Sequence, residues 1–228
     1  MSSRLHAHIL DQLGADITSG QLPPGTVLRV VDLSRNLNVS LPVMREAVRV
    51  LQALGLVSLT KRVGLRVLPE ADWNALEPLV IRWRLESPSR DEFLKSLVEL
   101  RRVVEPEAAR LAAENGAVED HSRLLALAEL MQETAQNPNE RATYFDADVK
   151  FHSLLMSAGR NPLFRSLAPA VIEAVRGRSG LGVHDDAVQA AEVDLHVTLA
   201  NAIASRNADR AEDAGRRLLG GIGRRLSS

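Results

Sequence analysis

The stretch SLPVMREAVRVLQALGLVSLTKRVGLRVLP, residues 40–69, contains the pattern that decides the fold of the first part of the chain. Apolar residues at helical spacing begin after Ser40, a residue type that commonly caps the start of a helix, and they end by Gly55. Two short runs of alternating apolar and polar residues follow, over 57–61 and 65–69. Alternation on both sides of a glycine-bearing tip is typical of a β-hairpin. The stretch therefore predicts one helix followed by a small hairpin.

Two further helices are predicted upstream of this stretch. Residues 4–18 carry an apolar side chain at every fourth position, and the prolines of LPPG at 22–25 cannot continue that helix. A short helix is expected near 30–37. Three helices followed by a hairpin form the layout of a winged helix-turn-helix. We therefore predict a winged helix-turn-helix domain that binds DNA over residues 1–69.

The third predicted helix has two faces of different chemistry. One face is apolar and suits packing on the first two helices; it consists of Met44, Ala47, Val48 and Leu51. The opposite face brings together, at spacings of three or four, Leu41, Arg45, Arg49 and Gln52. A helix in the major groove reads bases with such a face, because arginine can bond guanine through two hydrogen bonds. The start of this helix also suits a DNA phosphate, which makes Ser40 a candidate contact.

Two arginines on a helix are, by themselves, more often a solvated surface than a DNA contact. Here a tight turn precedes them and the basic tip Lys61-Arg62-Val63-Gly64 follows them. Charge is also uneven: residues 1–69 hold eight Lys or Arg and four Asp or Glu, a balance of +4, which leaves −5 for the remainder of a chain with net charge −1. A basic head on an acidic body favours a module that binds a polyanion.

The composition excludes several other classes of protein. The chain has no cysteine, so disulfide frameworks, thiolate nucleophiles and cysteine-type zinc sites are ruled out. Charged residues interrupt the first segment, and no uncharged apolar run approaches about 18 residues. We therefore expect a cytoplasmic protein without membrane contact.

Beyond residue 69 the pattern is helical throughout. We predict a second domain over residues 70–228, built as an all-α antiparallel bundle of six or seven helices. The breaks between helices fall at proline, glycine and asparagine positions. The expected helices span 71–86, 90–115, 119–136, 139–158, 162–178, 186–205 and 207–225.

The segment YFDADVKFHSLL, residues 144–155, carries the densest chemistry of the second domain. Asp148 and His152 are four residues apart on one predicted helix, so their side chains meet the same space. A carboxylate and an imidazole placed in this way can share a divalent metal ion, with His196 of a later helix as a third candidate ligand. The alternative is a buried pair in which Asp148 simply orients His152.

The segment ELRRVVEPEAARLAAE, residues 99–114, also has two interpretations. Arg101 could clamp the carboxylate of a small molecule, because guanidinium binds planar anions through paired hydrogen bonds. Arg101 and Glu105 are also four residues apart, a spacing that commonly gives an ion pair within a helix. The sequence shows no Ser-His-Asp arrangement and no glycine-rich phosphate loop, so we do not expect an enzyme. The alternative function is a helical metalloenzyme that uses Asp148, His152 and His196.

Taken together, these segments resemble GntR-type transcription regulators of the FadR-like branch, whose effector domain is the all-helical FCD domain. In the head, the resemblance lies in the PPG turn, in NVS before the third helix, in VMREAVRVLQALGLV through it and in Gly64 at the wing. In the body, it lies in ELRRVVEP, in DVKFH followed by NPLF, and in LHVTLANAI. The segment WNALEPLVIRWRLE, residues 73–86, looks most like repressors of galactonate and related sugar-acid catabolism.

This resemblance implies a homodimer that binds a palindromic operator in double-stranded DNA and releases it when a small organic acid enters the helical domain. The family positions that contact DNA correspond to Arg29, Arg45, Arg49 and Gly64, and Ser40 falls at the start of the recognition helix, where it is a further candidate contact. Three ligand positions for a zinc-like divalent metal ion correspond to Asp148, His152 and His196. Arg101 corresponds to a position that binds the carboxylate of the effector, and Arg176, late in a helix expected to flank the pocket, is a second candidate.

Two residues depart from the family pattern. Leu41 stands where the family usually has arginine, which removes one polar contact with DNA. Leu218 stands where many FCD domains have a fourth metal-binding histidine, so the expected metal site has three protein ligands at most.

The basic head separates a regulator from a metalloenzyme, because an enzyme has no use for a DNA-reading domain.

Overall fold

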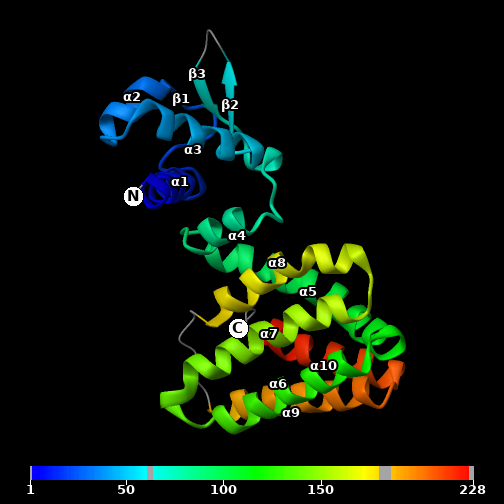
Figure 1. Cartoon of the computed structure of the whole chain (residues 1–228). Coiled ribbons are helices and arrows are strands. Elements are labelled where there is room, and N and C mark those ends of the chain that lie inside the picture. The colour runs from blue at the N-terminus through cyan, green and yellow to red at the C-terminus, as the bar shows by residue number, and fades with distance from the viewer. Residues whose placement is uncertain (1, 61–63, 180–185, 226–228) are drawn as a thin grey trace. The chain divides into compact units, whose positions relative to one another are not determined.

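The computed structural model describes residues 2–60, 64–179 and 186–225, and the chain forms two compact units, Met1–Arg90 and Asp91–Ser228 (Figure 1). The first unit is a winged helix-turn-helix, as predicted. Its elements are α1 (Ser2–Thr18), β1 (Val27–Leu28), α2 (Val30–Asn36), α3 (Leu41–Ala53), β2 (Val57–Thr60), β3 (Gly64–Val67), the 3-10 turn η1 (Glu70–Asp72) and α4 (Pro78–Leu85).

The core of the first unit forms where the apolar faces of the helices meet the hairpin. α1 contributes Ile9, Leu13 and Ile17, and α3 contributes the four residues of its predicted inner face. Strands β2 and β3 pair antiparallel, with Val57 opposite Val67. Strand β1 adds to the other edge of β3, so the sheet has the order β1-β3-β2. The sequence did not predict β1, because a strand of two residues carries no alternation that could be recognised.

The predicted helix over 71–86 is wrong in its first half. A 3-10 turn, η1, occupies the start, and α4 begins only at Pro78. Proline has no N–H and restrains the residue before it to extended backbone, so it fits the first turn of a helix and ends any helix that precedes it. The segment between the two helical pieces is held by Trp73, whose Nε1 donates to the carbonyl oxygen of Leu68 at 3.1 Å.

Helix α4 packs within the first unit. Val80 and Trp83 belong to the same buried cluster as the residues of α1 and α3. The Nε1 of Trp83 donates to Asp11 Oδ1 of α1 at 3.0 Å, and the ring lies so close to Gly14 that a Cβ there would overlap it. The predicted domain boundary falls after residue 69, at the end of the hairpin. The contacts of α4 instead place residues 70–90 with the head.

The second unit is an all-α bundle, as predicted. In the described part of the chain it contains six α-helices and one 3-10 turn: α5 (Arg90–Asn115), α6 (Val118–Thr134), η2 (Pro138–Glu140), α7 (Arg141–Ala158), α8 (Pro162–Ser179), α9 (Asp186–Ala204) and α10 (Ala208–Arg225). Helix α6 packs against α7 and α9, α7 packs against α8, and α9 packs against α10. The helix bounds agree with the predicted ranges to within about two residues.

Buried alanines allow close helix packing in the second unit. The α5 side chains of Ala108, Ala109, Ala112 and Ala113 are all buried in its core. Gly215 of α10 faces Pro106 of α5, where a Cβ would lie 3.1 Å from the proline Cα. None of the described helices has the length and apolar character needed to span a membrane.

Candidate functional site

The DNA-reading face predicted on α3 is exposed. Arg45 and Arg49 are both exposed, and Arg49 Nη1 donates to Glu46 Oε1 at 2.5 Å. Arg45 has no ion-pair partner among the described residues. Leu41, at the first position of the helix, is half-buried. The face therefore offers one unrestrained arginine and one arginine that is paired with an acid of the same helix.

The other predicted DNA contacts lie around this helix. Ser40 occupies the N-cap position with extended backbone, but its side chain makes no capping hydrogen bond, so its exposed hydroxyl is available to a ligand. Arg29 is exposed at the start of α2. Gly64 begins β3 with φ +101°, and a Cβ there would lie 2.7 Å from the carbonyl oxygen of Leu28. The wing therefore requires glycine at this position. The tip residues Lys61, Arg62 and Val63 lie outside the described residues.

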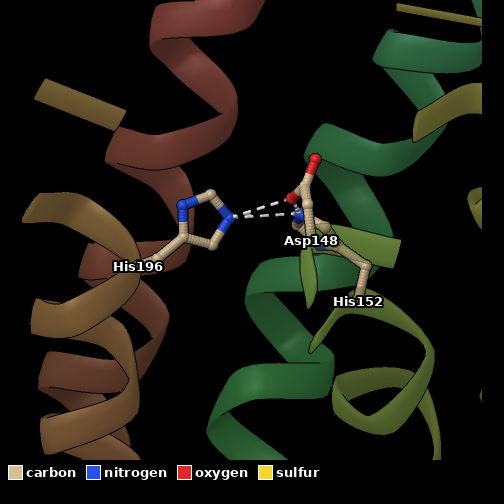
Figure 2. Close-up of side chains that lie close together, drawn as sticks. All are labelled: Asp148, His152 and His196. Atoms are coloured by element: carbon tan, nitrogen blue, oxygen red, sulfur yellow. Dashed lines mark hydrogen bonds and ion pairs between the residues drawn. The ribbon is translucent and has the colours of Figure 1, made fainter. Parts of the chain in front are cut away.

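A buried polar cluster lies in the core of the second unit. Asp148 and His152 project from α7 and His196 projects from α9, and Figure 2 shows His196 facing the other two. The Nε2 atoms of the two histidines are 3.3 Å apart. Asp148 Oδ1 lies 3.3 Å from His152 Nε2 and 3.4 Å from His196 Nε2. The three residues predicted as metal ligands are therefore brought together, and each is fully buried.

The second ring nitrogen of each histidine has an acceptor. His196 Nδ1 lies 2.8 Å from the backbone carbonyl oxygen of Glu192, which can only accept a hydrogen bond. His152 Nδ1 lies 2.6 Å from Glu105 Oε2 on α5. Both imidazoles therefore carry their proton on Nδ1 when neutral, and both present a lone pair at Nε2 to the centre of the triangle.

Arg101 and Glu105 form the other side of the cluster. Arg101 Nε donates to Glu105 Oε1 at 2.5 Å, so the ion pair within the helix is present. Arg101 Nη2 lies 3.2 Å and 3.4 Å from the two ring nitrogens of His152, which places the guanidinium beside the triangle. Its Nη1 is buried and has no hydrogen-bond partner in the described part of the chain. Arg101 therefore has one donor group left over after the ion pair forms.

The charges of the cluster shift the pKa values of its members. Burial raises the pKa of Glu105, but attraction to Arg101 and His152 outweighs burial and lowers the pKa to about 2. Burial lowers the pKa of His152, but attraction to Glu105 and hydrogen bonds to Asp148 and Glu105 give a net upward shift. Glu105 is therefore an ionised acceptor inside the protein core.

The structure does not bring Arg176 to this cluster. Its side chain is exposed on α8, where Nη1 donates to Glu173 Oε1 at 2.7 Å. Leu218 is fully buried in the core of the second unit, which also contains Phe151. The ring of Phe151 meets the rings of His152 and His196 edge to face, at centroid distances of 5.7 Å and 5.1 Å.

The contact between Glu105 and His152 was not predicted from the sequence. Glu105 was identified only as a neighbour of Arg101, because a spacing of four residues indicates contacts within one helix and not contacts between helices. Phe151 was missed for the same reason. Its position beside His152 in the sequence does not reveal that its ring also meets His196.

Comparison with known proteins identifies the family. The FCD domain profile matches residues 96–221, and the profile for bacterial regulatory proteins of the gntR family matches residues 5–67. The chain is a GntR-family regulator with an FCD domain. It is 29% identical over 222 residues to the galactonate operon transcriptional repressor of Escherichia coli, which covers 96% of this chain and 95% of the repressor.

Solved structures share the fold. A Listeria monocytogenes protein, Lar, described as controlling expression of the agr system, superposes with a TM-score of 0.68 at 17% identity, over 97% of this GntR-family chain and 96% of Lar. A GntR protein of Streptococcus agalactiae superposes with a TM-score of 0.55 at 21% identity, over 96% and 99% of the two chains. These comparisons confirm the predicted family. They also confirm the predicted function class, which is a DNA-binding transcription regulator and not an enzyme. The metalloenzyme alternative receives no support.

Proposed function

We propose that this GntR-family regulator is a repressor of an organic-acid catabolic operon, and that a small carboxylate bound beside a divalent metal ion in the FCD unit releases it from its operator. The observation that carries the proposal is the buried Asp148-His152-His196 triangle next to an arginine with an unused donor. The likeness to the galactonate operon repressor extends over nearly the whole chain, which favours a sugar acid as the effector.

The proposed operator contacts lie on the exposed face of α3 and around it. Arg45 and Arg49 are the candidates for base contacts in the major groove. Ser40 and Arg29 are candidates for phosphate contacts, and Gly64 sets the backbone of the wing. Arg49 must exchange its bond to Glu46 for a bond to DNA, whereas Arg45 has no such bond to break.

The triangle has the dimensions that a tetrahedral metal site requires. Ligand atoms at about 2.0–2.1 Å from a tetrahedral zinc ion are about 3.4 Å apart. The three distances here are 3.3, 3.3 and 3.4 Å. Two lone pairs and a carboxylate oxygen crowded at this distance repel one another unless a proton or a cation lies among them. The donor set therefore suits zinc or a similar divalent ion, which would supply a Lewis-acidic position for an anion.

The charge of the cluster favours an anionic effector. With neutral imidazoles, the two carboxylates of Glu105 and Asp148 and the guanidinium of Arg101 give the cluster a net charge of −1. A divalent ion changes the net charge to +1. A monocarboxylate then neutralises the site, and it can accept from the Nη1 of Arg101. With three protein ligands, the ion keeps a position open for that carboxylate or for water.

We also propose a homodimer whose two heads bind the two halves of a palindromic operator. Closed twofold symmetry is the commonest assembly of soluble oligomers, and it matches the symmetry of a palindrome.

A thermal-shift screen tests the proposed effector class. The protein is loaded with Zn²⁺ and heated with a panel of aldonic, uronic and short hydroxy acids, with the corresponding neutral sugars as controls. A ligand that binds only the folded state raises the Tm. When its free concentration is 100 times its Kd, it stabilises the protein by about 2.7 kcal/mol. We expect an acid to raise the Tm with Zn²⁺ and to have a smaller effect after chelation. A response to neutral sugars only would contradict the proposal.

A further inference from the structure

Glu105 contacts both Arg101 and His152, so two parts of the polar cluster depend on one carboxylate. Its Oε1 accepts from Arg101 Nε at 2.5 Å, and its Oε2 lies 2.6 Å from His152 Nδ1. It is fully buried at the middle of α5, whereas the three proposed metal ligands come from α7 and α9. Glu105 faces Nδ1 of His152, whereas Asp148 and His196 meet at Nε2, so the effect of Glu105 on a metal ion passes through His152.

The chemistry of that contact determines which nitrogen of His152 faces the metal. His152 lies between two carboxylates, with Glu105 Oε2 at 2.6 Å from Nδ1 and Asp148 Oδ1 at 3.3 Å from Nε2. A carboxylate can only accept a hydrogen bond, and only the contact with Glu105 is short enough for a normal N–H···O bond, so Nδ1 carries the proton. With the proton on Nδ1, Nε2 is left with a lone pair, and Nε2 is the atom that faces Asp148 and His196. In the opposite tautomer, the Nε2 proton would point into the triangle and no metal could bind there.

Glu105 also offsets the charge of Arg101. The guanidinium lies 3.2 Å from His152 Nε2, so it would face a bound cation as a second positive charge. A carboxylate in direct contact with Arg101 weakens that repulsion. The same residue therefore orients a ligand and lowers the electrostatic cost of placing a divalent ion beside an arginine.

We infer that Glu105 is a positioning residue of the metal site: it holds His152 in the Nδ1–H tautomer and so directs the Nε2 lone pair to the ion. The inference rests on the metal site put forward as part of the proposed function. Removal of such an outer hydrogen-bond partner weakens metal binding by about 10–100-fold in other metal sites.

The first test measures metal affinity in Glu105→Gln, which keeps the shape of the side chain and removes its charge. The probes are Co²⁺, followed by its visible absorption, and Zn²⁺, followed by competition with a chelating dye. We expect affinity for both ions to fall by about 10–100-fold. The matched control is Glu107→Gln on the same helix, because Glu107 also pairs with an arginine, Arg110, but is half-exposed. Equal affinity of Glu105→Gln and the unsubstituted protein would overturn the inference.

The second test needs no bound metal, and its result is read from the unsubstituted protein. Long-range proton–nitrogen correlation spectra of the metal-free, unsubstituted protein at alkaline pH report which nitrogen of each neutral histidine carries the proton, and His152→Gln identifies the signals of His152. We expect His152 to carry its proton on Nδ1. A proton on Nε2 would overturn the inference. If the protein binds no Co²⁺, the metal site itself fails, and this spectrum still decides whether Glu105 sets the tautomer.

Discussion

Arg45 and Arg49 lie one turn apart on α3, yet only Arg49 is paired with an acid, Glu46, in the described part of the head. The sequence predicts that both project from one face, because side chains at a spacing of four share a side of a helix. The spacing of three between Glu46 and Arg49 also favours an ion pair between them, whereas Glu46 is adjacent to Arg45 and projects about 100° away from it around the helix. The structure makes Arg45 the better candidate for reading the operator.

Arg45→Ala should weaken operator binding by about 1–3 kcal/mol and reduce the preference for the operator over random DNA. The substitution removes a contact with a base of the operator. Random DNA lacks that base at the corresponding position in most sequences, so its affinity should fall less. Fluorescence anisotropy with an operator selected from a random-sequence pool measures both affinities. Arg165→Ala, an exposed arginine of α8, is the control and should change neither. Equal losses on both DNAs would make Arg45 a phosphate contact instead.

The resemblance to FCD domains places a fourth metal-binding histidine at the position of Leu218, and Leu218→His tests that expectation. An unpaired polar ring in the core should lower the stability of the metal-free protein by about 1–3 kcal/mol. Zn²⁺ should then raise the Tm of the variant more than it raises the Tm of the unsubstituted protein, because a fourth ligand tightens binding.

The matched control is Leu219→His, since Leu219 is also buried but is turned by about 100° around the helix. It should lose stability without gaining a larger response to Zn²⁺. Equal responses of the two variants would show that Leu218 does not face the ion.

The site illustrates which contacts a sequence reveals. The pairing of Asp148 with His152 and of Arg101 with Glu105 follows from spacing along one helix, and both pairs are present. The bond between Glu105 and His152 joins α5 to α7, so no local pattern reports it. His196 was a candidate as a histidine inside a later helix, and the family resemblance gave it a ligand position; its distance along the chain from Asp148 gives no geometric reason to join them.

At the scale of elements, long helices were predicted well and short elements were not. Helices α5 through α10 each have at least 17 residues, and the breaks between them fall at proline, glycine or asparagine positions. Strand β1 has two residues, and the region before α4 is shaped by Pro78 and by the hydrogen bond that Asn74 N donates to the carbonyl oxygen of Leu54 in the preceding turn. The position of α4 against α1 depends on the contact of Trp83 with Asp11 and Gly14, which no periodicity predicts.

Gly14→Ala should destabilise the head although alanine favours helices. The helix gains roughly 1 kcal/mol from the substitution. The added methyl group overlaps the buried ring of Trp83, and overpacking of a core costs about 1–3 kcal/mol. Thermal unfolding followed by Trp fluorescence measures the net change, which we expect to be a lower Tm.

Gly220→Ala is the control for helix propensity, because nothing lies within 4 Å of the Cβ that it adds to α10. It should raise stability by about 0.5–1 kcal/mol. If Gly14→Ala stabilised the protein as Gly220→Ala is expected to do, the close contact between α1 and α4 would be absent in solution.

At the scale of the whole molecule, one unit carries the proposed DNA-reading face and the other carries the buried cluster. The proposed regulation requires that binding in the second unit changes the DNA affinity of the first. We expect the functional species to be a dimer, because two heads must address two half-sites of one operator. Light scattering at micromolar concentration should give twice the mass of the 24.9 kDa chain. A monomer that still binds one full operator tightly would contradict this.

We expect an acid bound at the metal site to release the operator, and an anisotropy titration measures that release. Labelled operator bound to Zn²⁺-loaded protein is titrated with the acid found in the thermal-shift screen. We expect release from the unsubstituted protein, and a weaker response after chelation, in His152→Ala and in Arg101→Lys, which keeps the charge but loses the planar fork of donors. DNA binding without the acid should persist in all of them. Unchanged release in both variants would show that the acid binds elsewhere.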